Sequence, residues 1–245
     1  MTKEITYLNY LKKERLPTQW CPGCGNGIVL KLVCLAMEKL NFSQKDTVIV
    51  SGIGCSGRSA GFFNLDSVHS VHGRAIPVAE GIKNANENLN VIVVSGDGDL
   101  LGIGGNHLLH ASRRNTNISV VCIANSIYGM TGGQSSPTTE QGSRTLTAPQ
   151  GSAETPIDVQ SFLKAHHCYY ARSTVFHFNH AEKCITESFQ FKGLSFVEIK
   201  TQCITNDGRR RGFKNAYEML ISYKENYKIN NKAEVLEHNE IGIIR

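Results

Sequence analysis

The sequence contains an aspartate and an asparagine that each follow a short apolar, β-branched segment. Asp97 lies within Gly-Asp-Gly-Asp directly after residues 90–95, and Asn125 comes directly after residues 117–124. Glycines beside Asp97 allow the chain to turn tightly against a ligand. A carboxylate and an amide oxygen, with a backbone carbonyl and two diphosphate oxygens, could form the octahedral oxygen cage that suits Mg²⁺. Gly-Asp-Gly alone also occurs in ordinary turns, so the second polar residue after a second strand makes the pattern specific.

Cysteines form a second group of candidates. Cys21 and Cys24 flank a Pro-Gly turn that would let two thiolates converge on one metal, and Cys55 and Cys203 each come just after an expected strand. Four thiolates suit a structural zinc ion or a [4Fe–4S] cluster equally well by number. A redox dithiol is the third reading of Cys-X-X-Cys, but it requires a preceding strand that the sequence does not indicate.

Strands alternating with helices must position these residues. We expect strands at 47–51, 67–71, 90–95, 117–124, 169–172 and 194–200, and helices at 25–40, 75–86, 102–113, 157–166, 180–191 and 215–227. This alternation predicts an α/β fold whose mostly parallel sheet has helices on both faces. Ligands of such sheets bind at the carboxyl ends of the strands. The helix near residue 102 should direct backbone N–H groups toward a phosphate there. The long polar segment between Asn125 and Pro156 is typical of a functional loop.

The bulk composition narrows the class of protein. A chain of 245 residues with 40% hydrophobic and 19% charged residues is ordinary for a folded soluble protein. The net charge of +5 is mild and its basic residues are scattered apart from Arg209–Arg211, which disfavours a nucleic-acid partner. No apolar stretch reaches the roughly 18–20 residues that cross a bilayer, and residues 1–7 contain no apolar core of a secretion signal.

We therefore expect a cytoplasmic protein without membrane or nucleic-acid partners. Thiols stay reduced in that compartment, so we expect no disulfide framework among the eight cysteines. Four of them should be small apolar residues of the core: Cys34, Cys122, Cys168 and Cys184.

Five motifs occur together in one order along the chain. They are Trp-Cys-Pro-Gly-Cys-Gly-Asn from residue 20, Gly-Ile-Gly-Cys-Ser-Gly-Arg from 52, His-Gly-Arg-Ala-Ile-Pro-Val-Ala-Glu-Gly-Ile-Lys from 72, Gly-Asp-Gly-Asp-Leu-Leu-Gly-Ile-Gly-Gly-Asn-His-Leu-Leu-His from 96, and Asn-Ser-Ile-Tyr-Gly-Met-Thr-Gly-Gly-Gln-X-Ser-Pro-Thr from 125. Over about residues 17–205 the chain resembles β subunits of 2-oxoacid:ferredoxin oxidoreductases. The resemblance implies one thiamine-diphosphate-binding domain over 1–245, with its core at about 17–205 and a C-terminal extension at about 206–245.

The resemblance also assigns roles to residues. It implies a Mg²⁺ ion held by Asp97, Asn125 and the carbonyl of Ile127, and a [4Fe–4S] cluster held by Cys21, Cys24, Cys55 and Cys203. The expected contacts of thiamine diphosphate are Ile53, Gly54, Cys55, Ser56, His72, Gly98, Asp99, Gly129 and Met130. Arg58 matches a basic residue that binds the substrate carboxylate, which favours 2-oxoglutarate over pyruvate; a loop arginine paired with a local acid is the alternative.

The activity that the resemblance implies is oxidative decarboxylation of 2-oxoglutarate to succinyl-CoA and CO₂. Coenzyme A would be the co-substrate, and electrons would pass through the cluster to ferredoxin or flavodoxin. We find no second thiamine-binding domain, and Glu80 lies in a helix, where it is a poor candidate for the glutamate that activates thiamine. We therefore expect activity only with a larger α subunit, accompanied in the 2-oxoglutarate type by γ and ferredoxin-like δ subunits.

Three alternatives remain at this point. The chain could be the β subunit of a pyruvate or branched-chain 2-oxoacid:ferredoxin oxidoreductase. It could be a cluster-free thiamine decarboxylase or ligase fragment, which the four placed cysteines argue against. It could also be a non-catalytic, zinc-stabilised binding module, in which Asp97 and Asn125 would have no role.

Overall fold

A computed structural model of the protein describes residues 6–244. Residues 1–5, part of the segment in which we found no secretion signal, lie outside the described residues. The main sheet has eight strands in the order β2-β1-β3-β4-β8-β7-β10-β9. The strands are β1 (Thr47–Ser51), β2 (Asp66–His69), β3 (Asn90–Gly96), β4 (Ser119–Ala124), β7 (Tyr169–Thr174), β8 (Ser195–Lys200), β9 (Lys228–Ile229) and β10 (Glu240–Ile244). Pairing from β2 through β7 is parallel throughout, and β10 is antiparallel to β7.

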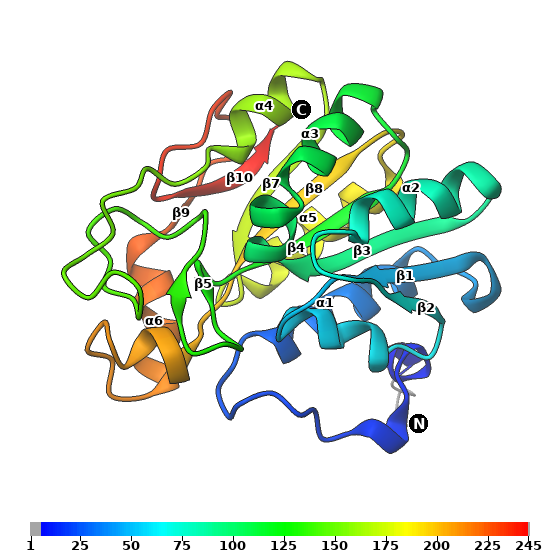
Figure 1. The fold of residues 1–245 in the computed structure, drawn as a ribbon. Helices are drawn as coiled ribbons and strands as arrows, with labels where there is room; N and C mark the ends of the chain where they lie inside the picture. Colours follow the sequence, from blue (N-terminus) through cyan, green and yellow to red (C-terminus); the bar gives the residue numbers. More distant parts are fainter. Residues whose placement is uncertain (1–5, 245) are drawn as a thin grey trace.

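Helices cover both faces of this sheet, as the sequence predicted (Figure 1). One face packs against α1 (Asn26–Lys39) and α5 (Phe178–Gln190), and the other against α2 (Ala75–Ala85), α3 (Gly105–Arg114) and α4 (Val159–Ala165). The strands alternate as a pleated sheet requires: Ile49 lies in the core on the α1 side, whereas Val48 and Val50 lie in the core on the α2 side. No helix among residues 6–244 combines the length and the apolar character of a membrane span.

The C-terminal residues differ most from expectation. The predicted helix is present as α6 (Ala216–Asn226), but we predicted no strand after it. Residues that we set apart as an extension instead supply β9 and β10 to the main sheet, where Gly242 pairs with Arg172. Figure 1 shows β10 lying along β7, far from α6 in the view. The Glu-Ile-Gly-Ile-Ile segment is short and interrupted by glycine, so its own preference for a β-strand is weak. It forms a strand because it pairs with β7, which is distant in the sequence.

Two further differences lie near the strand ends. The helix expected from about residue 102 begins at Gly105, and a π-helical turn, η5 (Gly98–Ile103), comes before it. The N–H of Gly104 bonds to the carbonyl of Asp99 at 3.0 Å, which closes the wider turn. The segment from Asn125 to Pro156 is mostly irregular, as predicted, but it contains a short hairpin formed by β5 (Ile127–Tyr128) and β6 (Gln134–Ser135).

The N-terminal segment lies along the edge of the sheet beside β2. It contains two 3₁₀ turns, η1 (Thr6–Tyr10) and η2 (Lys13–Arg15), and Leu11 forms an antiparallel bridge with Phe63. The Trp20 indole N–H donates to the carbonyl of Cys55 at 2.7 Å. Leu11 and Trp20 thus fix this segment to the residues between β1 and β2.

Candidate active site

A cavity of about 100 Å³ lies at the carboxyl ends of β1, β3 and β4. Its lining contains all the residues that we predicted for the cofactor and for magnesium: Ile53, Gly54, Cys55, Ser56, His72, Asp97, Gly98, Asp99, Asn125, Ile127, Gly129 and Met130. The cavity is smaller than the roughly 300–1,000 Å³ that encloses a drug-sized ligand. The described residues therefore enclose a space that could hold only part of a ligand of that size.

Asp97 and Asn125 meet at this cavity. The Asp97 carboxylate is 1% exposed, and one of its oxygens accepts hydrogen bonds from Ser136 Oγ at 3.0 Å and from the Thr138 hydroxyl. Its other oxygen lies 3.4 Å from the backbone nitrogen of Asn125. Asn125 Oδ1 in turn accepts the N–H of Ile127 at 3.2 Å, so the three predicted magnesium ligands adjoin one another.

The surroundings of Asp97 fit a bound cation. Burial raises the pKa of Asp97, although the hydroxyls of Thr138 and Ser136 oppose that shift. Within residues 6–244, no lysine or arginine forms an ion pair with this carboxylate. A buried carboxylate ordinarily requires a paired charge or a coordinated metal. Its oxygen donors, beside the amide oxygen of Asn125, are of the kind that Mg²⁺ prefers.

The hydroxyls of Ser136 and Thr138 were not among the predicted site residues. They belong to the long segment after β5, and both side chains are buried. The signal in the sequence is Ser-Pro-Thr, which ends the fifth motif and contains both residues. That signal does not show which carboxylate the hydroxyls contact, because the loop has no periodicity from which its path could be predicted.

Asp99 lines the cavity, as predicted for a residue that contacts the cofactor. Its carboxylate also joins two loops of the protein to β3. Oδ1 accepts the N–H groups of Ile53 at 3.1 Å and Gly73 at 2.8 Å, and Oδ2 accepts the hydroxyl of Ser95 at 2.9 Å. His72 Nδ1 lies 2.7 Å from Oδ1, at ion-pair distance but without the alignment of a hydrogen bond. Asp99 therefore positions the loops that line the cavity.

Two glycines leave room for these contacts. A Cβ atom at Gly52 would lie 1.8 Å from Asp99 Oδ2, so a side chain there would displace the carboxylate. A Cβ atom at Gly98 would lie 2.4 Å from the ring of Tyr128, whose hydroxyl donates to the Gly98 carbonyl at 3.1 Å. Tyr128 thus covers the turn after Asp97 and lines the cavity, a contact that we did not predict.

The four candidate cysteines gather beside this cavity. Burial is the main cause that raises the pKa of Cys24 to about 11. The neighbouring thiols of Cys203, Cys55 and Cys21 add to this increase. The backbone N–H of Asn26 opposes this increase, and the N–H groups of Asn206 and Asp207 likewise oppose the increase that burial causes in the pKa of Cys203. Across residues 6–244, however, no three His, Cys, Asp or Glu side chains adopt a metal-holding arrangement. The four thiols lie in the same region, but no three of them are close enough together to hold one metal ion.

Cys203 also lies close to the predicted magnesium ligands. A Cβ atom on Gly129 would lie 3.3 Å from Cys203 Sγ and 4.0 Å from Asn125 Nδ2. Gly129 therefore lies between the thiol of Cys203 and the side-chain amide of Asn125. A further bond from Asn206 Nδ2 to the Gly129 carbonyl, at 2.6 Å, ties the loop after β8 to the loop after β4.

Arg58 lies outside this cavity, in a neighbouring one of about 750 Å³. Ile53, Gly54 and Met130 line both cavities, so the two adjoin. Arg58 Nη1 donates to Gln19 Oε1 at 2.6 Å, and no carboxylate of the described chain forms an ion pair with it. The alternative that Arg58 pairs with a local acid therefore finds no support.

Other polar candidates have structural roles. Glu80 accepts hydrogen bonds from Arg114 at 2.6 and 3.0 Å and from the hydroxyl of Thr116 at 2.6 Å, which leaves it unsuited to activating thiamine. Arg211 of the basic run pairs with Asp207 at 3.5 Å. The remaining cysteines are buried and unpaired, as predicted: Cys34, Cys122, Cys168 and Cys184.

Comparison with known proteins agrees with this geometry. Residues 52–199 match the family model of the C-terminal TPP-binding domain of thiamine pyrophosphate enzymes. The 2-oxoglutarate synthase subunit KorB of Methanothermobacter marburgensis is 45% identical over 98% of this chain and 84% of its own length. The 2-oxoglutarate synthase subunit KorB of Methanocaldococcus jannaschii is 44% identical over 96% of this chain and 87% of its own length.

A solved structure gives the same result. The 2-oxoglutarate:ferredoxin oxidoreductase from Magnetococcus marinus, with 2-oxoglutarate, coenzyme A and succinyl-CoA bound, superposes with a TM-score of 0.86 at 29% identity, over 99% of this chain and 85% of the other. Both the thiamine-diphosphate fold and the family that the sequence motifs indicated are therefore confirmed. The chain belongs to the β subunits of the 2-oxoacid:ferredoxin oxidoreductases.

Proposed function

We propose that this chain is the β subunit of a 2-oxoglutarate oxidoreductase. The complete enzyme would convert 2-oxoglutarate and coenzyme A to succinyl-CoA and CO₂, with electrons passing to ferredoxin or flavodoxin. The observation that carries the proposal is the single cavity in which all the predicted cofactor and magnesium residues meet. The KorB relatives, named 2-oxoglutarate synthase subunits, favour this substrate over pyruvate and branched-chain 2-oxoacids.

The residues at the strand ends would hold the diphosphate end of the cofactor. Asp97, Asn125 and the carbonyl of Ile127 would bind Mg²⁺, and the hydroxyls of Ser136 and Thr138 would keep the carboxylate oriented. Asp99 would fix the loops that contain Ile53 and His72 against the cofactor. When bound, thiamine diphosphate supplies the electron sink that loss of CO₂ from a 2-oxoacid requires.

Cys21, Cys24, Cys55 and Cys203 would hold a [4Fe–4S] cluster beside this site. Backbone N–H groups lower the pKa of Cys24 and of Cys203 against the effect of burial, which would favour the thiolates that bind iron. A cluster there supplies one-electron transfer. The proximity of Cys203 to Asn125 across Gly129 would keep the two cofactors close together.

An α subunit would complete the site. Large apolar side chains are exposed around the cavity and the loops beside it: Ile53 at 39%, Met130 at 45%, Ile103 at 64% and Val71 at 69%. Such grouped apolar surface is typical of a protein interface. The glutamate that activates thiamine would come from that partner, since Glu80 is engaged by Arg114. We include γ and ferredoxin-like δ subunits and a cytoplasmic location in the proposal; unpaired cysteines fit that compartment.

The test is an anaerobic preparation of the chain with its α partner. Coenzyme-A-dependent reduction of a viologen dye is measured with 2-oxoglutarate, pyruvate and a branched 2-oxoacid, together with the iron and zinc contents. We expect the highest kcat/KM with 2-oxoglutarate, and four irons for each β chain as in one [4Fe–4S] cluster. Preference for another 2-oxoacid would overturn the substrate assignment, and zinc without iron would favour the binding-module alternative.

A further inference from the structure

Helix α1 begins directly beside two of the four candidate cysteines. Its first residue, Asn26, follows Cys24 and Gly25 in the sequence. The Gly25 N–H donates to the carbonyl of Gln202, the residue before Cys203, at 3.3 Å. A Cβ atom at Gly25 would lie 3.0 Å from Gln202 Oε1, which leaves little room for a side chain. The start of α1 and the loop after β8 therefore pack closely together.

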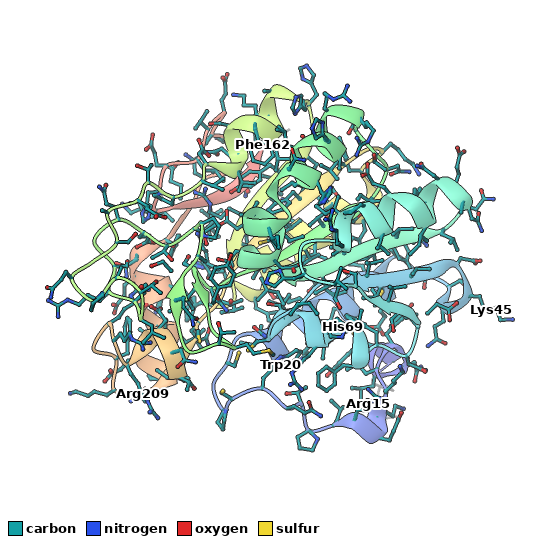
Figure 2. The ribbon with its side chains drawn as sticks, viewed as in Figure 1. Arg15, Trp20, Lys45, His69, Phe162 and Arg209 are labelled. Carbon is teal, nitrogen blue, oxygen red and sulfur yellow. The ribbon has the colours of Figure 1, made fainter. Side chains whose placement is uncertain are left out.

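The Pro-Gly turn before α1 packs on the same part of the chain. A Cβ atom at Gly23 would lie 2.2 Å from the Cβ atom of Ala216, the first residue of α6. Figure 2 shows Trp20, which precedes this turn, and Arg209, which lies between β8 and α6, both in the lower part of the view. These contacts fix the start of α1 relative to the loop that contains Cys203.

The side-chain amide of Asn26 is buried at this position. Asn26 is 1% exposed, and within residues 6–244 neither its Nδ2 nor its Oδ1 forms a hydrogen bond. A buried amide without hydrogen bonds destabilises a folded chain, so native proteins satisfy nearly all such groups. Leucine has the same branched shape and would avoid this cost. The amide is therefore suited to a polar group from outside residues 6–244.

Thr201 has an unpaired polar atom too, but its surroundings differ. Its side chain is 2% exposed, and its hydroxyl has no hydrogen bond within the described residues. Thr201 lines a polar cavity of about 30 Å³ together with Asn125 and Lys200, whereas Asn26 does not line it. A water molecule requires roughly 10–15 Å³ of such space, so water can serve the hydroxyl of Thr201. This explanation does not extend to Asn26.

The start of α1 favours negative charge. The helix has 14 residues, its first turn contains no acidic side chain, and its N-cap residue, Gly25, has no side chain that could bond to the free N–H groups. The partial positive charge of a helix N-terminus stabilises an anion there. The N–H of Asn26 also opposes the increase that burial causes in the pKa of Cys24. These features suit sulfur atoms that carry the negative charge of an iron–sulfur cluster.

We propose that Asn26 raises the reduction potential of the [4Fe–4S] cluster by donating a side-chain N–H to one of its sulfur atoms. This inference rests on the proposed function and extends it to a residue other than the four thiols. Hydrogen bonds to cluster sulfurs stabilise the reduced, more negative state and so raise the potential. Asn26 thereby makes the cluster a better acceptor of electrons from the 2-oxoacid.

The reduction potential of the anaerobic complex tests this inference. Asn26→Leu keeps the branched shape but removes the N–H, so the equilibrium constant for one-electron reduction of the cluster should fall about tenfold, which corresponds to 59 mV. A redox titration followed by electron paramagnetic resonance of the reduced cluster measures the shift. The matched control is Thr201→Val, which removes an unpaired buried hydroxyl beside the same helix start and should change the constant by less than about twofold.

Two further measurements separate a hydrogen bond from a structural role. Pulsed electron paramagnetic resonance of the reduced complex in D₂O should lose the coupling of an exchangeable deuteron in Asn26→Leu. The cofactor-free full chain with this substitution should be at least as stable to urea as the unmodified chain, since the amide has no partner within residues 6–244 to lose. If leucine prevents the cluster from assembling, Asn26→Ala replaces it and should shift the potential in the same direction.

Four results overturn the inference: an unchanged potential, equal shifts in Asn26→Leu and Thr201→Val, an unchanged deuteron coupling, or a cofactor-free chain that is destabilised by the leucine. An unmodified complex that contains no iron contradicts the proposed function instead.

Discussion

Two buried carboxylates of the sheet have opposite surroundings. Glu198 in β8 is 5% exposed and Asp97 after β3 is 1% exposed. Glu198 lies 2.8 Å from Lys200 Nζ and 3.1 Å from Arg172 Nε, and it accepts the Tyr170 hydroxyl at 2.6 Å. Asp97 accepts hydrogen bonds from two hydroxyls, with only a long contact to the Asn125 N–H.

The difference indicates which of the two carboxylates serves a structural role. Burial would raise the pKa of Glu198, but the charges of Lys200 and Arg172 outweigh it and hold that pKa well below its usual range. The pKa of Asp97 is raised by burial, and nearby donors do not reverse the shift. Glu198 is balanced by this chain alone, whereas Asp97 is suited to a cation that comes with a ligand.

The largest expected effect is on activity in Asp97→Asn. The amide would keep the packing but lose the anionic ligand of Mg²⁺, so the complete enzyme should lose more than the roughly 10- to 100-fold typical of an outer-shell change. Viologen reduction at saturating thiamine diphosphate and Mg²⁺ measures this loss. Without cofactors, the unfolding free energy of the variant should equal or exceed that of the unmodified chain. An active Asp97→Asn enzyme would contradict the comparison.

Glu198→Gln should give the reverse pattern. Removing one partner leaves Lys200 and Arg172 buried without their counter-charge, so the free energy of unfolding should fall by about 3–5 kcal/mol. Urea denaturation of the full chain, followed by circular dichroism, measures this change. Once folded, the variant should keep its requirement for Mg²⁺. A loss of cofactor binding without a loss of stability would remove the distinction between the two carboxylates.

Thr138→Val should have a smaller effect at the site. The substitution keeps the shape of the side chain but removes a hydroxyl that orients Asp97, so the concentration of Mg²⁺ needed for half-maximal activity should rise by about tenfold. Thr116→Val is the matched control, because it removes the hydroxyl of a half-buried threonine that contacts Glu80 instead. Equal effects of the two substitutions would indicate a general loss of packing.

The smallest effect is a dependence of stability on pH. Because the folded-state pKa of Glu198 is lowered, its stabilisation is present above the usual glutamate pKa of about 4.3 and is lost as the pH falls toward the folded-state value. The difference in unfolding free energy between the unmodified chain and Glu198→Gln should be constant from pH 7 to about 5 and shrink below about 4. A difference that grows on acidification would have the wrong sign.

The local sequence was sufficient to predict where the strands end. It was insufficient to predict which groups contact the residues at those ends. β-branched segments before Asp97 and Asn125 predicted the parallel strands, and strand-end geometry then predicted that these residues meet. The donors to Asp97 and Asp99 could not be predicted, since Thr138, Ile53 and Gly73 lie in irregular loops whose paths depend on tertiary packing. β10 was missed for the same reason: its ladder to β7 depends on a distant partner.

The most direct test of the magnesium site uses Mn²⁺ in place of Mg²⁺ and pulsed electron paramagnetic resonance of the anaerobic complex. We expect Mn²⁺ to bind together with thiamine diphosphate, with coupling to its phosphorus atoms in the unmodified and Glu198→Gln enzymes and none in Asp97→Asn. Phosphorus coupling of equal strength in Asp97→Asn would show that Asp97 does not hold the metal, and would contradict the account of this site.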